Sequence, residues 1–259
     1  LDMFAGPAPG DPFIIAPPER SYREELSRPT GNLRVGIALT KWGESDVDAE
    51  VLHAVKRTGE TLQSMGHQIE EFEAAFDPQD IVLAVMGGFH LGIASLNEAA
   101  AMMGRKIDNT TLEPVNLKLY QSGQLLPMSH AGEIFEAMRR VRALVGMAAK
   151  DFDVLLTPSL PGTARPHGEY STTREDLSAE EYMKGDIRLF QFLGVFNVTG
   201  QPSVSLPLAQ GSDGLPIGVQ LAGRLGDEAV LIRVARDLEE AMPWYARTPP
   251  VHAANPAMS

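Results

Sequence analysis

Two stretches near the end of the chain decide the fold: Asn197–Pro207 (NVTGQPSVSLP) and Asp213–Leu221 (DGLPIGVQL). Each joins a turn rich in Gly and Pro to a short apolar run, which predicts strands over 203–208 and 217–222. The tight turn over 211–216 predicts that the two strands form a hairpin. We expect both strands to pair in the interior of a sheet.

Upstream of the hairpin, strand and helix patterns alternate. An apolar run over 33–39 predicts a buried strand, an amphipathic helix follows over 48–65, and residues 67–72 alternate as another strand. Strand, helix and strand in this order favour a crossover connection in an α/β layer. A continuous apolar run over 153–157 predicts a further strand.

The other periodic segments predict helices. They are a buried helix over 81–103, helices over 117–125 and 131–151, an apolar helix over 182–196 and a closing helix over 228–241. The polar segment 161–181 between two of them is expected to be an exposed loop.

No internal repeat or linker divides the chain, so we expect one α/β unit. Residues 1–31, rich in Pro and Gly, are interpreted as a connector, 32–249 as the α/β portion and 250–259 as a tail. The chain begins Leu1-Asp2-Met3, without an initiator Met or a signal-peptide pattern. This start favours a cut through a larger structure, and a cytoplasmic location is expected.

Composition excludes several classes of function. The 259 residues are 44% hydrophobic and 22% charged, as in soluble globular proteins, and the net charge is −12. So acidic a chain disfavours nucleic acid and anionic membranes as partners. The absence of cysteine excludes disulfides and thiolate chemistry. We found no run of about 18 apolar residues and therefore expect no membrane-spanning helix.

Familiar catalytic and cofactor motifs are also absent. The sequence holds no GxSxG, Walker, GxGxxG or HExxH pattern, and its six histidines have no metal-binding spacing. His90, in an apolar helical segment, is better explained as a satisfied core histidine. We therefore predict no metal, no cofactor and no catalytic residue in this chain.

Five sequence blocks, taken in order, resemble the amidase-signature family of hydrolases. They are the connector over 5–12, Phe152–Pro158 (FDVLLTP), Asn197–Pro207, Asp213–Leu221 and Gly226–Ala229 (GDEA). The resemblance runs from residue 1 to about Pro249. It implies the C-terminal portion of the amidase-signature fold, which is α/β with a mixed β-sheet flanked by helices on both faces.

The resemblance also implies what this chain lacks. In the family, a Ser nucleophile, a second Ser in a cis peptide and a Lys general base hydrolyse amides, and all three lie in the N-terminal half. This chain has no Ser-Ser dipeptide and no Gly-Gly-Ser, and Lys41 follows Thr40 rather than opening the family's Lys motif. We expect it to be inactive alone and to need the missing N-terminal half.

The C-terminal half of the family supplies part of the substrate pocket. By their positions before the Asn197 block, Ile187, Phe190 and Gly194 resemble its pocket-facing residues, three and four residues apart on a helix. The competing interpretation is that Ile187 and Phe190 are simply core residues.

Three hypotheses about function follow. The chain is part of an amidase acting on a small-molecule amide, whether as a truncated piece, a proteolytic product or one chain of a split enzyme, and a second copy in a homodimer is one partner to expect. Alternatively, it is a non-catalytic binding or assembly protein whose uncovered half-fold needs a partner. The third, a hydrolase with an independent site of scattered Ser, His and Asp, has no local motif in its favour.

Overall fold

The central sheet is mixed, as the resemblance implies. The structure is a computed structural model that describes residues 1–12, 14–74, 76–249 and 251–252. Its strands lie in the order β2-β1-β3-β5-β4, with β1, β2 and β3 parallel and β5 antiparallel to both β3 and β4. The strands are β1 (Arg34–Ile37), β2 (Gln68–Glu71), β3 (Val154–Pro158), β4 (Ser203–Gln210) and β5 (Pro216–Gly223).

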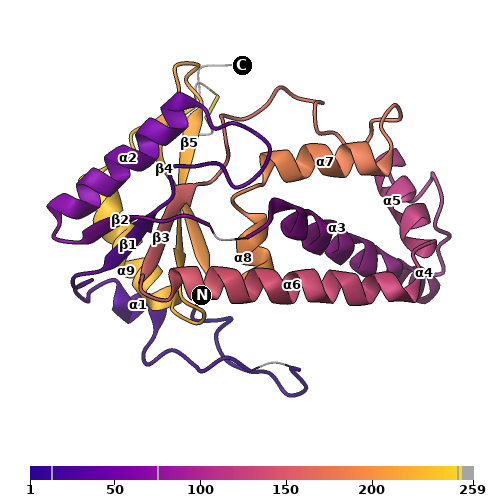
Figure 1. The fold of residues 1–259 in the computed structure, drawn as a ribbon, viewed down its shortest axis with the longest axis horizontal. Helices are drawn as coiled ribbons and strands as arrows, with labels where there is room; N and C mark the ends of the chain where they lie inside the picture. Colours follow the sequence, from indigo (N-terminus) through magenta and orange to yellow (C-terminus); the bar gives the residue numbers. More distant parts are fainter. Residues whose placement is uncertain (13, 75, 250, 253–259) are drawn as a thin grey trace.

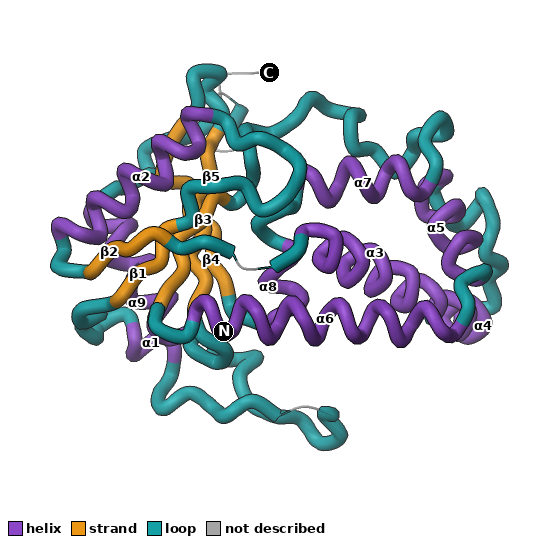
Figure 2. Tube along the Cα trace, in the orientation of Figure 1, coloured by secondary structure: helices purple, strands orange, loops and turns teal. Residues whose placement is uncertain are grey.

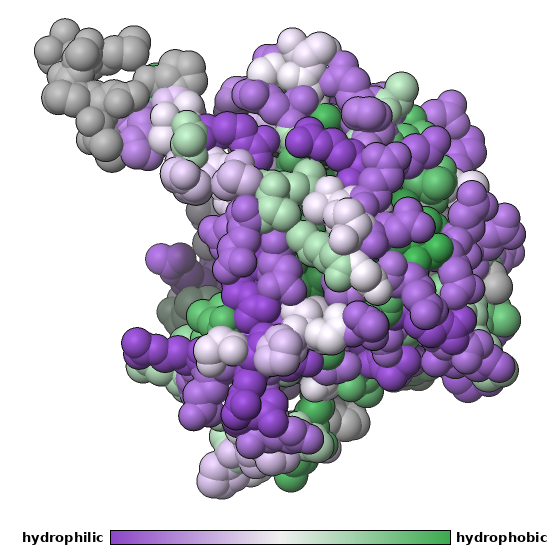
Figure 3. Space-filling model, turned by 90° about the vertical axis from the view of Figure 1, so that its left-hand side faces the viewer, coloured by the Kyte–Doolittle hydropathy of each residue, from purple (hydrophilic) through white to green (hydrophobic). Residues whose placement is uncertain are grey.

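Helices cover both faces of this sheet (Figures 1 and 2). One face carries α2 and α9, and the other faces a helical layer to which α3, α6 and α8 belong. Seen from the side of α2, the surface is mainly hydrophilic with apolar groups between (Figure 3). The helices are α1 (Tyr22–Glu25), α2 (Ala49–Ser64), α3 (Pro78–Ala94), α4 (Leu96–Met103), α5 (Pro114–Gln124), α6 (Met128–Ala149), α7 (Ala179–Leu189), α8 (Gly194–Thr199) and α9 (Glu228–Ala241).

Strand β5 is buried on both faces. Val219 and Leu221 pack into the apolar cluster under α2 and α9, whereas Ala222 belongs to the cluster under α3, α6 and α8. Because successive strand residues face opposite sides, one strand contributes to both cores. The predicted hairpin and the closing helix over 228–241 are confirmed.

Strand β4, however, lies at an edge of the sheet. Among the described residues it pairs with β5 on one side only. The prediction that both hairpin strands lie in the interior is therefore wrong for β4. The turn sequence specified the hairpin, but the second neighbour of a strand depends on chain segments far away.

The predicted buried helix over 81–103 also needs correction. Helix α3 begins earlier, because the Asp77 side chain caps it by accepting from the amide of Gln79, and Ser95 separates it from α4. It is not buried throughout: Phe89 is 54% and Met102 84% exposed. By length and composition alone, residues 78–103 could cross a membrane, and 18% of their apolar 18-residue window is buried; the expectation of no such stretch is corrected to this extent.

The predicted helix over 182–196 consists of two helices. Helix α7 begins at Ala179, because Ser178 and Glu181 form a reciprocal capping box, and its last turn ends at Phe190. Helix α8 begins only at Gly194. The exposed loop expected up to 181 is shorter by these first residues of α7.

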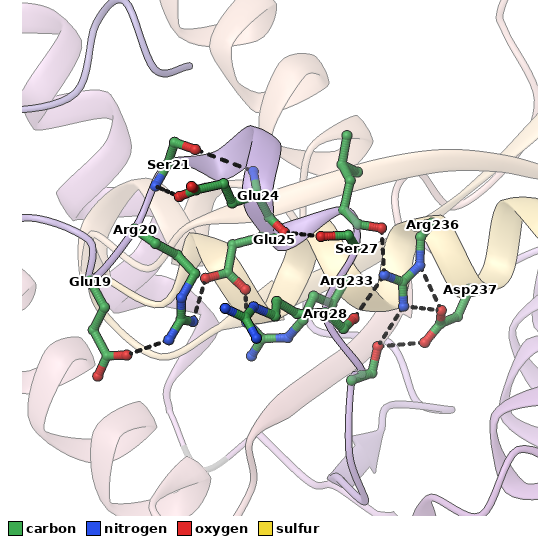
Figure 4. Close-up of polar contacts among 12 residues, drawn as sticks. Glu19, Arg20, Ser21, Glu24, Glu25, Ser27, Arg28, Arg233, Arg236 and Asp237 are labelled. Atoms are coloured by element: carbon green, nitrogen blue, oxygen red, sulfur yellow. Dashed lines mark hydrogen bonds and ion pairs between the residues drawn. The ribbon is translucent and has the colours of Figure 1, made fainter.

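A polar cluster fastens the N-terminal segment to α9 (Figure 4). The Glu25 side chain is buried between the guanidinium groups of Arg20 and Arg233. Arg236 donates to the carbonyl oxygens of Leu26 and Arg28, both at 2.8 Å. The stretch interpreted as a connector thus contains α1. The predicted tail lies outside the described residues except for 251 and 252.

The contact between α3 and α6 predicts a difference between two glycines. A Cβ at Gly87 would lie 2.3 Å from Cγ1 of the fully buried Ile134, whereas one at Gly92 has no atom within 4 Å. We expect Gly87→Ala to lower the free energy of unfolding by about 1–3 kcal/mol through overpacking. Gly92→Ala, in the same helix, should raise it by about 0.5–1 kcal/mol. Urea unfolding measures both, and equal effects would contradict the packing described.

Candidate functional site

The described residues hold a serine pair but no catalytic constellation around it. The hydroxyl groups of Ser159, after β3, and Ser205, on β4, lie 2.6 Å apart. A nucleophilic serine needs a base within hydrogen-bond reach. In the described chain neither hydroxyl bonds to a histidine, a lysine or a carboxylate, and no group of three or more metal-binding side chains occurs. Ser159 is buried and Ser205 is exposed, and among the described residues the pair has no base beside it that could activate a nucleophile.

The three predicted pocket residues do not share one helix face. Ile187 lies in the last turn of α7, Phe190 is its C-cap and is 40% exposed, and Gly194 begins α8. A Cβ at Gly194 would lie 3.1 Å from Cγ2 of Val85, so this glycine permits the close approach of α8 to α3. The spacing of three and four assumed one continuous helix, and the break after α7 invalidates that assumption.

Ile187 does line a cavity of about 140 Å³. The cavity lies between α7, the start of α3 and the loop after β1. Apolar side chains and Glu44, Lys184 and Arg188 contribute to its wall, and the two cations are paired with Glu180 and Glu44 at 2.7 and 2.9 Å. The lining residues are Trp42, Gly43, Glu44, Pro78, Gln79, Ile81, Val82, Lys184, Ile187, Arg188 and Gln191.

Two buried glutamines that the sequence analysis did not single out hold this region together. Gln191 accepts from the amide of Trp42 at 3.1 Å and donates to the carbonyl of Ser45 at 3.0 Å. Gln220, on β5, donates to the Thr157 hydroxyl and to the carbonyl of Phe192. The link between α7 and α8 is thereby fixed to the sheet. The sequence block that contains Gln220 indicated the family, but it did not indicate which distant residues Gln191 and Gln220 contact.

The Gly- and Pro-containing block over 200–202 connects helix α8 to the sheet. Gly200 has a φ of +78°, which allows it to end α8 in the left-handed region. Gln201 then donates to the carbonyl of Gly223 at 2.8 Å, and the amide of Gly223 donates to the carbonyl of Pro202. This block therefore joins α8 to β5, which is a structural role.

An apolar groove of about 440 Å³ runs beside α8. Val85, Phe89 and Leu96 line it from α3 and α4, and Met138 lines it from α6. Arg142 also lines it and donates to the carbonyl of Val198 at 2.6 Å. The groove is the part of the layer of α3, α6 and α8 that no other described element covers.

Among the histidines, His90 lies on α3, and its side chain reaches Ser122 of α5. Its Nε2 atom is 3.3 Å from the Ser122 hydroxyl, and burial, with the nearby His130, lowers its pKa. It has a partner, as predicted, but is half-buried rather than in the core.

Asp186, on α7, has an unusual carboxylate. It is half-buried, and burial raises its pKa from 3.8 to about 6. Within the part of the chain that the structure describes, its side chain makes no hydrogen bond or ion pair. The neighbouring cations Lys184 and Arg188 pair with Glu180 and Glu44 instead.

Comparisons with known proteins define the class. The family model described as amidase matches residues 1–232, and the chain therefore belongs to the amidase family. It is 28% identical to a 6-aminohexanoate-cyclic-dimer hydrolase of Pseudomonas sp. (strain NK87), covering 96% of this chain and 52% of that protein. It is 31% identical to a putative amidase AmiC of Mycobacterium tuberculosis (strain ATCC 25618 / H37Rv), covering 92% and 50%.

The structural similarity covers about the same share of each chain as the sequence similarity. A solved structure of 6-aminohexanoate cyclic dimer hydrolase with its substrate superposes with a TM-score of 0.85 at 26% identity, over 95% of this chain and 52% of that one. The chain thus spans about half the length of the curated relatives it matches. The fold is that of amidase-signature enzymes over this half.

The Asp186 carboxyl predicts a pH-dependent effect on stability. Its folded-state pKa is raised, so the folded chain binds the proton more tightly, and stability falls as pH rises from about 4 through about 6. We expect Asp186→Asn to be more stable than the unchanged chain by about 2 kcal/mol above pH 7, with the difference vanishing near pH 4. Denaturant unfolding at a series of pH values measures this difference. A constant difference across the range would show that Asp186 titrates normally.

Proposed function

We propose that this chain is part of an amidase that hydrolyses a carbon–nitrogen bond in a small molecule. The observation that carries the proposal is the match to half of a hydrolase, combined with a sheet whose edge strand β4 is paired on one side only among the described residues. An unpaired strand edge leaves backbone groups without partners and favours a further strand or segment beside it.

The apolar groove supports the same conclusion. Phe89 is 54% exposed on it, and outside the groove Leu144 and Met147 of α6 are also exposed, by 41% and 66%. Exposed apolar surface of this kind is typical of an interface. We infer that the remainder of the amidase domain covers the groove and the β4 edge.

In this proposal the catalytic residues belong to the remainder of the amidase domain and not to this chain. The family resemblance implies a Ser nucleophile activated through a second Ser and a Lys, and the described residues bring together no such group. The role of this chain is to provide the sheet scaffold and part of the substrate pocket, where Ile187 lines the cavity.

The substrate class is a small-molecule amide. Relatives named 6-aminohexanoate-cyclic-dimer hydrolase make that compound a first candidate, and the largely apolar wall near Ile187 would suit an aliphatic chain. A cytoplasmic location, with neither nucleic acid nor membrane as partner, is part of the same proposal.

Complementation tests whether this chain needs the remainder of the domain to hydrolyse an amide. The chain alone is expected to release no amine from a panel of amides that includes 6-aminohexanoate cyclic dimer. Produced together with, or joined to, the sequence encoded directly before it, it should gain hydrolysis. Turnover by the chain alone would overturn the proposal. A completed domain that hydrolyses no amide, with this chain as a stable dimer, would favour the binding or assembly protein.

Phe190 tests the pocket assignment in the completed enzyme. If its ring faces the substrate, Phe190→Ala should change kcat/KM about tenfold between short and long acyl chains, because each buried methylene contributes about 0.8 kcal/mol. Leu125→Ala removes a side chain that is 84% exposed on another helix and is the control. Unchanged preference over the series would assign Phe190 a packing role.

A further inference from the structure

Helix α7 carries a carboxylate, that of Asp186, whose surroundings do not stabilise its negative charge. Asp186 lies in the last turn of the helix, where the negative end of the helix dipole disfavours an anion. It is also half-buried and lacks a cationic partner among the described residues. Residues that break local rules without compensation are expected at functional sites.

Aromatic side chains flank this carboxylate. Tyr182 lies one turn before Asp186, at the i, i+4 spacing that places side chains on one helix face, and Phe190 is the C-cap that ends the turn after Asp186. Burial, and then the negative charges of Asp186 and Glu113, raise the pKa of the Tyr182 hydroxyl. The amide of Phe190 donates to the carbonyl of Asp186 at 2.8 Å, which continues the helical turn to that ring.

A third ring lies beside the same turn. A Cβ at Gly185 would be 3.3 Å from Cε1 of Tyr170, so the Tyr170 ring lies against the backbone next to Asp186. Tyr182 donates its hydroxyl to the carbonyl of Tyr170 at 3.1 Å, which fixes that loop to α7. A carboxylate on a helix that also carries aromatic residues can offer a cation both a charge partner and π-faces.

We propose that Tyr182, Asp186 and Phe190, here called the α7 strip, bind a primary ammonium group carried on an apolar chain. The carboxylate pairs with the ammonium, and the rings contact the attached methylene groups. The ammonium has two sources: a small molecule, such as an amine substrate or product, or a lysine side chain of the rest of the domain. As a substrate subsite the strip rests on the proposed function, but as an ammonium site it can be tested on this chain without any hydrolysis.

NMR of the chain with 13C-labelled aspartate tests the proposal, with n-hexylammonium as the probe and 1-hexanol as its uncharged counterpart. We expect hexylammonium to shift the Asp186 carboxyl signal saturably and to lower the pKa of this carboxyl. Asp186→Asn should weaken binding about tenfold, whereas Asp151→Asn, at an exposed site, should leave it unchanged. Hexanol should not bind comparably.

An Asp186 signal that does not respond to hexylammonium, or that responds equally to hexanol, would overturn the proposal, and neither result depends on a variant folding. In the completed domain without added amine, an Asp186 pKa already lowered would identify a protein cation as the source. Continued binding of hexylammonium there would identify a small molecule. Loss of amide hydrolysis in that domain would bear on the proposed function and not on these binding results.

Discussion

Strand β5 imposes the constraint on which the rest of the structure depends. It pairs with β3 on one side and β4 on the other, and its alternating side chains enter both apolar clusters. Burial of Val219 and Leu221 fixes the layer of α2 and α9, and Gln220 fixes the link between α7 and α8. A shift of its register by one residue would exchange these faces and separate both layers from the sheet.

The same strand also fixes the position of the region around the cavity. The cavity beside Ile187 and the α7 strip both belong to helix α7, which reaches the sheet through the buried Phe192 link. The sheet itself ends at β4, and the groove beside α8 is open. A sheet whose edge at β4 is unpaired in the described chain, together with an uncovered apolar groove, is what we expect if further chain of the same domain packs against this one.

Local signals allowed much of the fold to be predicted. The turn at Gly214, whose φ is +81°, and the apolar runs on both sides specified the hairpin, and the period of residues 228–241 specified α9. The edge position of β4 was missed because strand neighbours are set by distant segments. The breaks at Ser95 and after α7 were missed because the apolar pattern continues across them.

The site was predicted less well than the fold. Ile187 was named as a substrate-pocket residue, and that role stays a prediction; Trp42 and Gln191, which line the same cavity, come from a distant loop and a helix link. Asp186 carries no motif. Its lack of a partner becomes visible only when the neighbouring helices and their ion pairs are in place.

Amide hydrogen exchange at β4 tests most directly the claim that this chain is an incomplete amidase domain. In the chain alone, we predict that the amides of Ser203–Gln210 not bonded to β5 exchange rapidly, since no described segment pairs with them. In the completed domain the same amides should be protected as strongly as those of β5. Equal exchange at β4 in both samples would mean that nothing docks on this edge, and would contradict the account.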